Sequence, residues 1–265
     1  MATRMSTVMQ DRAGAALARV WFYLPIFLVL GAWQVVVMAG VLPSDMLPSP
    51  SQISVAMWEL AAAGDLGYHV GASVYRQMTG FLIAAAFGVA LGISMAHVEW
   101  VRTTIEPIVR LTYPLPKSAL IPMLILVFGI GHNSKIFAVF LGCLLPVVLS
   151  AFNGTRGVEN QLVWSARSLG TGSARMLWKV YFMAALPEIL SGLRIALAIS
   201  YTLMISAELL IARAGIGYLI QTLGEAGEYP SMFAGVFIIS LIGFATDRIY
   251  VNFMNWMLRW RDQEA

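Results

Sequence analysis

Residues 136–152, IFAVFLGCLLPVVLSAF, decide the fold of this chain because they form an apolar block without a charged side chain. A transmembrane helix needs about 20 mostly apolar residues to cross about 30 Å of hydrocarbon. Comparable apolar blocks recur along the chain, at 22–42, 81–98, 111–130, 184–211 and 232–258. We therefore predict an all-α, polytopic membrane protein with about six transmembrane helices in one domain over residues 1–265.

The overall composition also indicates a membrane protein. Hydrophobic residues make up 59% of the 265 positions and charged residues only 12%, whereas soluble domains are about a quarter charged. The formal charge of +3 is carried by Lys and Arg between the apolar blocks, as in membrane topology signals. We expect membrane lipid as a partner and no nucleic acid.

The basic residues predict the orientation of the chain. The block 22–42 is longer than the core of a signal peptide, about 7 to 15 residues, so we expect an uncleaved first span. If the N-terminus lies in the cytoplasm, the connections on the opposite side of the membrane contain only three basic residues, Arg76, Lys135 and Arg213. The cytoplasmic segments receive Arg4, Arg12, Arg19, Arg102, Arg110, Arg156, Arg167, Arg175, Lys179, Arg259 and Arg261. Cytoplasmic segments carry the excess of Lys and Arg, which predicts a cytoplasmic N-terminus (1–20), connection (153–183) and tail (259–265).

Three segments have internal structure that the spans do not explain. Prolines interrupt the first half of the block 111–130, so we expect a kinked or partly re-entrant helix there. The outer connection 43–80 opens with LPSPS at 47–51, which predicts an ordered, non-helical start before a helix over 53–62. The connection 153–183 has helical periodicity on both sides of Gly170, which predicts two short helices around a glycine turn.

A source of energy for transport is missing from the chain. The phosphate-binding loop requires a Gly-rich turn followed by Gly-Lys-Ser/Thr, and GTGS at 170–173 lacks that lysine. Any ATP hydrolysis must therefore come from a partner, which would hold the ATP and magnesium. His69, His97 and His132 lack the spacing of a helical metal site, and Cys143 stands alone, so we expect neither a metal site nor an embedded enzyme.

Two sets of motifs resemble a known family. SARSLG at 165–170, followed by AALP at 184–187, resembles the Glu-Ala-Ala loop of permease subunits in binding-protein-dependent ABC importers. Trp164 stands where that family usually has the signature glutamate, and Ser165 where it has the first alanine. Further motifs resemble those of the taurine, aliphatic sulfonate and nitrate branch of this family: LPSP at 47–50, ALIP at 119–122, FGIG at 128–131, GLR at 192–194, AE at 207–208 and DR at 247–248.

The resemblance implies a type I ABC importer-like permease in the cell inner membrane, with a small, anionic solute such as a sulfonate, nitrate or carboxylate as its substrate. It implies three partners: a cytoplasmic ABC ATPase dimer, an extracytoplasmic solute-binding protein and a second permease copy in a homodimer. It also implies a coupling loop that docks into the ATPase. The residues of this loop are Ser165, Ala166, Arg167, Leu169, Gly170 and Pro187.

A seven-residue repeat in the block 184–211 places Arg194, Tyr201 and Glu208 along one slowly drifting helix face. Charges within spans are costly and usually face the protein interior or an aqueous cavity. These residues therefore either line the translocation pathway, where Arg194 would attract an anion, or form interhelical pairs or lie at the membrane edges. For the adjacent Asp247 and Arg248 we expect structural pairing.

An ion-gradient-driven secondary transporter or channel is the alternative function, with Arg194, Glu208 and Asp247 as its intramembrane charges. Such folds often show paired, broken helices in two related halves. The sequence has one proline-broken block and no internal repeat, which favours the ATP-driven importer.

Overall fold

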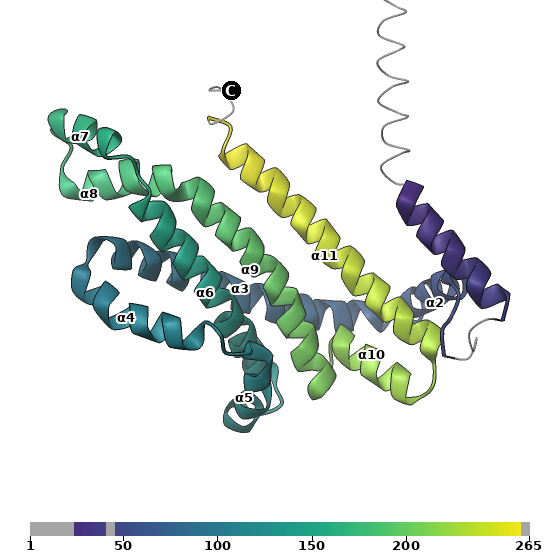
Figure 1. The fold of residues 1–265 in the computed structure, drawn as a ribbon. Coiled ribbons are helices and arrows are strands. Elements are labelled where there is room, and N and C mark those ends of the chain that lie inside the picture. The colour runs from purple at the N-terminus through teal and green to yellow at the C-terminus, as the bar shows by residue number, and fades with distance from the viewer. Residues whose placement is uncertain (1–23, 41–45, 261–265) are drawn as a thin grey trace, which may run out of the picture.

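The computed structural model describes residues 24–40 and 46–260, and this part of the chain contains helices and no β-strand (Figure 1). An apolar helix over Leu24–Met38 comes first. The elements that follow are α2 (Pro50–Ala62), α3 (Leu66–His97), α4 (Glu99–Thr112), the 3-10 helix η1 (Lys117–Leu120), α5 (Ile121–Phe128), α6 (His132–Arg156), α7 (Asn160–Ser168), α8 (Ser173–Met176), the π-helix η2 (Leu177–Tyr181), α9 (Phe182–Leu210), α10 (Ile216–Glu225) and α11 (Tyr229–Met257).

Four helical runs of the described chain are long and apolar enough to cross a membrane: α3, α6, the run Ser173–Leu210 and α11. A fifth span is possible if α4 and the η1–α5 segment act together, although they are bent by 91° at the break between them. This bend confirms the kink that the prolines of 111–130 predict. The expected span 22–42 lies partly outside the described residues, and its described part is the shorter helix Leu24–Met38.

Helix α3 begins at Leu66, well before the predicted span 81–98. Its early turns carry Arg76, which is buried, so the prediction that Arg76 lies in an outer connection was wrong. The same prediction was wrong for Lys135, which is fully buried in the first turn of α6. A polar side chain that finds partners inside the protein does not need water, so a span can continue past residues at which a hydropathy pattern ends.

Glycines allow the long helices to approach one another closely. A Cβ on Gly80 of α3 would lie 2.6 Å from the Ile136 carbonyl oxygen, and one on Gly92 would lie 2.5 Å from the Val148 carbonyl oxygen. Gly192 of α9 makes a similar close approach to Ser150 of α6. Helices in lipid associate mainly through van der Waals packing, which favours small residues at their contacts. The glycines therefore define how α3, α6 and α9 pack.

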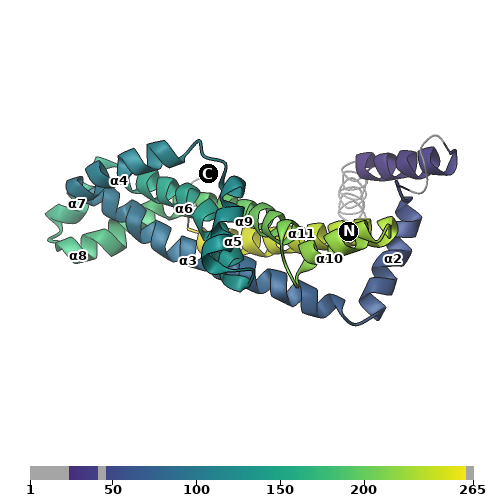
Figure 2. The same cartoon turned by 90° about the horizontal axis from the view of Figure 1, so that it is seen from below.

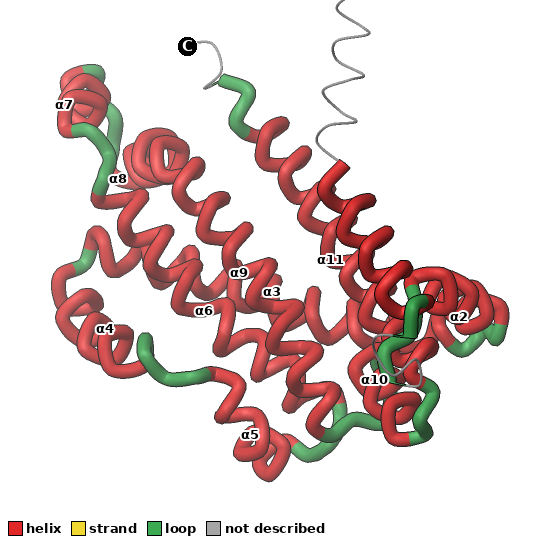
Figure 3. The backbone as a smooth tube through the Cα atoms, turned by 45° about the vertical axis from the view of Figure 1, so that its right-hand side comes forward, coloured by secondary structure: helices red, strands yellow, loops and turns green. Residues whose placement is uncertain are grey.

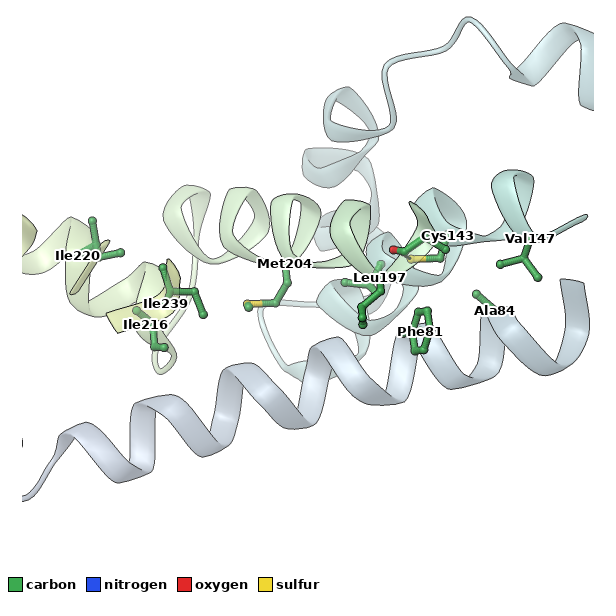
Figure 4. Packing of buried hydrophobic residues seen from close by; sticks show 11 residues of the cluster. Phe81, Ala84, Cys143, Val147, Leu197, Met204, Ile216, Ile220 and Ile239 are labelled. Carbon is green, nitrogen blue, oxygen red and sulfur yellow. Dashed lines mark hydrogen bonds between the residues drawn. The ribbon is translucent and has the colours of Figure 1, made fainter. Parts of the chain in front are cut away.

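The apolar core joins these three helices to α10 and α11. Figure 4 shows its side chains between the ribbons: Phe81, Ala84, Cys143, Val147, Leu197, Met204, Ile216, Ile220 and Ile239. Cys143 is fully buried, and its thiol donates to the Ala196 carbonyl oxygen at 3.2 Å. It packs as a small hydrophobic residue of the core.

Helix α2 begins at Pro50, inside the LPSPS stretch that was expected to be non-helical, and ends at Ala62 as predicted. Ser49 forms a capping box with Gln52: its Oγ accepts from the Gln52 amide at 3.4 Å, and its own amide donates to the Gln52 Oε1 at 2.8 Å. Pro50 occupies the first helical turn, where its missing N–H costs nothing. Beside α2, the Trp33 ring stacks on Phe237 of α11 with 6.2 Å between ring centroids.

The short helices lie at two separate ends of the long ones. Helices α7 and α8 extend from one end of α6 and α9, and α10 and α2 lie toward the opposite end (Figures 1 and 2). Figure 3 shows the same separation, with green loops joining the short helices at each end. We call these the α7–α8 end and the α10 end.

Candidate coupling and transport sites

The α7–α8 turn is built around Gly170, which has φ of +74°. The Gly170 amide donates to the Arg167 carbonyl oxygen at 2.9 Å, and the Thr171 amide donates to the Ala166 carbonyl oxygen at 3.1 Å. These two bonds form the Schellman motif, which ends a helix on a residue in the left-handed region and favours glycine there. The predicted glycine turn between two short helices is confirmed.

The second short helix is not separate from the membrane span. Helix α8 runs through the π-helical segment Leu177–Tyr181 into α9, so that Ser173–Leu210 is one helical run. Short π-helical insertions are frequent at functional sites. The helix that follows the turn at Gly170 is therefore continuous with α9.

The surface of α7 carries large apolar side chains outside the apolar spans. Trp164 is 63% exposed and Leu169 is 85% exposed, and large exposed apolar side chains outside lipid are typical of protein interfaces. Ser165 and Arg167 are also exposed, and Ala166 is half-buried. Behind this surface lies a cavity of about 460 Å³ whose lining includes Arg167 and, from the end of α3, His97.

The structure does not bring Pro187 to this surface. Pro187 lies inside α9 and is half-buried, about 20 Å along the helical run from Ser173 at 1.5 Å per residue. The other predicted loop residues, Ser165, Ala166, Arg167, Leu169 and Gly170, do lie together on α7 and its turn.

Glu208 lies in a buried polar cluster at the α10 end. Its side chain is fully buried, and the Arg76 guanidinium donates to its Oε1 at 2.6 Å. Its other oxygen, Oε2, accepts from Ser73 Oγ at 2.7 Å and from the Gly217 amide at 3.0 Å. The carboxylate therefore has both a counterion and neutral donors.

The same cluster caps the N-terminus of α10 with side chains distant in sequence. The Gly215 amide donates to His69 Nδ1 at 3.1 Å, and the Ile216 amide donates to Ser73 Oγ at 2.8 Å. The first amides of a helix have no partner within the helix, and a negative charge nearby is stabilising. Gly215 has φ of +118° and lies against the Glu208 carboxylate, where a Cβ would clash. Glu208 thus anchors α10 to α3 and α9.

Arg194 pairs with Asp247 across α9 and α11. The pair is bidentate, with Nε to Oδ1 at 2.8 Å and Nη2 to Oδ2 at 2.9 Å. The pairing expected for Asp247 is confirmed, and Arg248 lies over the Phe244 ring instead. The side chains of Arg194 and Asp247 are 47% and 38% exposed, so the pair remains accessible from the surface of the described chain.

Tyr201, the next predicted residue after Arg194 on α9, also contacts α11. Its hydroxyl is 2.8 Å from Thr246 Oγ1. Elsewhere between the same two helices, the Tyr250 hydroxyl donates to the Leu190 carbonyl oxygen at 2.8 Å. Tyr201 and Asp247 also line a groove of about 530 Å³ between α9 and α11. Of the residues predicted on one face of α9, Tyr201 is therefore near an open groove, Arg194 is in an accessible pair, and Glu208 is enclosed.

Arg76 is the site residue that the sequence pattern did not reveal. Ser73, Arg76, Gln77 and Gly80 share one buried face of α3, at the spacing of a helix. That spacing could have indicated that the helix begins before residue 81, but the polar character of these residues led to their assignment to a connection.

No group of three His, Cys, Asp or Glu residues in the described ranges could hold a metal ion.

Comparison with known proteins gives the family. Residues 88–259 match the model of the binding-protein-dependent transport system inner membrane component. The taurine transport system permease protein of Escherichia coli is 35% identical, with 82% of this chain and 80% of that protein covered. A putative aliphatic sulfonates transport permease protein of Bacillus subtilis is 33% identical, with 88% and 85% covered. The nitrate import permease protein of Synechococcus elongatus is 26% identical, with 85% and 84% covered.

The fold agrees with a solved structure. A chain of the inward-facing MetNI methionine ABC transporter matches with a TM-score of 0.54 and 16% identity, covering 69% of this chain and 94% of that one. At this identity the likeness shows the fold, which is that of a type I ABC importer permease. This chain belongs to the family of binding-protein-dependent transport system inner membrane components, as the multi-pass permease subunit of an ATP-driven ABC importer in the taurine, sulfonate and nitrate branch, with the ATPase in a partner subunit.

Proposed function

We propose that this permease carries a small anionic solute, of the sulfonate, nitrate or carboxylate class, through a pathway formed where two copies of the chain meet. The relatives named above include permeases for taurine, aliphatic sulfonates and nitrate. A small number of spans does not easily enclose both a pathway and its gates, which favours a homodimer.

The coupling between ATPase and pathway is carried by the α7–α8 turn. The single observation behind this proposal is the continuous run Ser173–Leu210, which leads from the turn at Gly170 to the groove beside Tyr201. An ATPase dimer with bound ATP and magnesium would engage Trp164 and Leu169, both highly exposed. Its closure would then shift the population between two conformations of the pathway.

The orientation follows from the basic residues. The α7–α8 end would face the cytoplasm with both termini, and the α10 end would face outward, where a solute-binding protein delivers the substrate. The excess of Lys and Arg in the connections at the α7–α8 end supports this orientation.

The proposal is tested by reconstitution. The permease is placed in liposomes with its ATPase, and uptake of taurine, an alkanesulfonate and nitrate is measured with the binding protein outside and ATP inside. We expect uptake of at least one anion that depends on ATP and on both partners. Uptake that proceeds equally without the ATPase would overturn the proposal and favour an ion-gradient-driven carrier.

A further inference from the structure

Two hollows of the molecule meet at Lys117, the first residue of η1 after the 91° break. One is a groove of about 530 Å³ between this break and the faces of α6 and α9. The other is a more enclosed cavity of about 240 Å³ under α4, with almost entirely apolar walls. Lys117 lines both hollows, so a cation stands at the mouth of an apolar space within the broken span.

The ammonium group of Lys117 has two backbone partners and a spare donor. It donates to the carbonyl oxygens of Thr112 and, at 3.0 Å, of Tyr113, at the end of α4. A lysine ammonium has three N–H donors, so two hydrogen bonds leave one N–H free. These carbonyls hold the group in place beside the groove.

No carboxylate lies within salt-bridge distance of Lys117 in the described ranges, nor of Lys135, which is fully buried and donates to the Ile130 carbonyl oxygen. Two arginines of the long helices are paired instead. Arg76 pairs with Glu208, and Arg194 pairs with Asp247. An unpaired charge in a span is costly, and such residues are found where a partner or a water-filled path compensates them. Lys117 therefore has the electrostatic character of a site that gains from a bound anion.

The opposite wall of the groove offers hydroxyl groups. Thr202 and Ser206, one turn apart on α9, line the groove at Lys117 and also the groove between α9 and α11. Thr202 Oγ1 donates to the Ala198 carbonyl oxygen at 3.4 Å and Ser206 Oγ to the Thr202 carbonyl oxygen at 2.8 Å, and a hydroxyl can rotate from such a bond to donate to a ligand. Ser118 adds another hydroxyl on the Lys117 side. These hydroxyl groups therefore line the space between Lys117 and the groove at Tyr201.

We propose that Lys117, together with Ser118, Thr202 and Ser206, forms an anion-binding site in the groove between the broken span and α9. The inference rests on the proposed function, since it places the selective step for an anionic solute at the break. The ammonium supplies the countercharge, and the hydroxyls supply neutral donors. The site suits a small, singly charged oxyanion such as a sulfonate, nitrate or carboxylate.

The test measures the local potential and needs no knowledge of the substrate. A thiol is introduced by Thr202→Cys, and the complex with its ATPase is treated with an anionic sulfonatoethyl and a cationic trimethylammonioethyl methanethiosulfonate. The ratio of the anionic to the cationic reaction rate reports the charge in the groove. Cys143 is fully buried, and the complex without the introduced thiol corrects for its background reaction.

We expect Lys117→Gln to lower this ratio about fivefold, because a unit charge lining the same groove acts oppositely on the two reagents. Lys117→Arg keeps the charge and should keep the ratio, even if Lys117→Gln weakens the end of α4. The matched control is Lys179→Gln, which removes an exposed lysine at the α7–α8 end and should leave the ratio unchanged. Nitrate and ethanesulfonate should slow modification of the introduced thiol with Lys117 present, and not after Lys117→Gln.

Two results would overturn the site: a ratio that Lys117→Gln leaves unchanged, or equal protection by the anions with and without Lys117. Either would leave Lys117 as a cap of α4 only. Failure of the proposed function appears differently, as a complex whose uptake of solutes does not depend on the ATPase while the charge effect at the introduced thiol persists.

Discussion

Arg76 of α3 and Glu208 of α9, 132 positions apart in the sequence, form a buried ion pair with 2.6 Å between Nη1 and Oε1. Arg76 also donates to the Ala214 carbonyl oxygen at 2.6 Å, just before α10. The Arg76–Glu208 pair therefore joins α3 to α9 and to the connection that follows α9. Its position makes it a structural support for the α10 end of the molecule.

Glu208→Gln should destabilise the permease strongly, because it leaves the Arg76 charge buried without a counterion. Breaking a buried pair on one side typically costs about 3 to 5 kcal/mol. The measurement is the thermal unfolding midpoint of the purified protein in detergent. Glu228→Gln, at an exposed carboxylate before α11, is the control and should change the midpoint little. In the double variant Arg76→Met with Glu208→Gln, the loss should be smaller than the sum of the single losses. Strict additivity would contradict the pairing.

The role of Arg194 can be separated into pairing and anion attraction. Arg194→Gln leaves Asp247 unpaired and should lower ATP-dependent uptake, as should Asp247→Asn, which leaves Arg194 unpaired. If the pair serves to join α9 and α11, the double variant Arg194→Gln with Asp247→Asn should recover most of the uptake lost by either single change. A double variant as defective as Arg194→Gln alone would show instead that the guanidinium acts on the solute.

Gly170→Val should release the ATPase while leaving the permease in the membrane. Gly170 has φ of +74°, a region that costs an L-residue roughly 1–2 kcal/mol and is worse for a β-branched side chain. The turn would rearrange, and α7 would no longer present Trp164 and Leu169 in the same place. The measurement is copurification of the ATPase, followed by ATP-dependent uptake.

Gly172→Val is the matched control for this turn. Gly172 has φ of −70° and ψ of 159°, which valine adopts readily, and a Cβ there has open space. It should therefore retain the ATPase. Equal loss of the ATPase in both variants would mean that the loop tolerates no added side chain, and the backbone explanation for Gly170 would fail.

Gly92→Leu should separate α3 from α6. Even a Cβ at this position would lie 2.5 Å from the Val148 carbonyl oxygen, so the helices must move apart and lose packing. Overpacking of a close-packed interior typically costs about 1 to 3 kcal/mol. Gly71→Leu, on the same helix with open space at its Cβ, is the control. Fluorescence-detected size-exclusion chromatography after heating should show a lower midpoint for Gly92→Leu alone.

Much of the architecture could be predicted because the bilayer imposes a local requirement. A span must be apolar over its own length, so 136–152 and 232–258 indicate α6 and α11 without knowledge of their neighbours. The prolines of 111–130 predict the bend, and the glycine between two periodic stretches predicts the turn at Gly170. Each of these signals depends on residues close together in the sequence.

The tertiary structure alone decided which charges neutralise one another. Arg76 interrupts an apolar pattern and reads as part of a connection, yet Glu208 lies beside it in the fold and makes its burial possible. Similarly, Arg194 has its counterion on α11, whereas Lys117 donates, within the described chain, only to backbone carbonyl oxygens at the end of α4. Hydropathy is a sum over neighbours in sequence, whereas the cost of a buried charge depends on partners in space. The sequence therefore determined the membrane fold and the turn, and the packing of α3, α9 and α11 decided the roles of the charges.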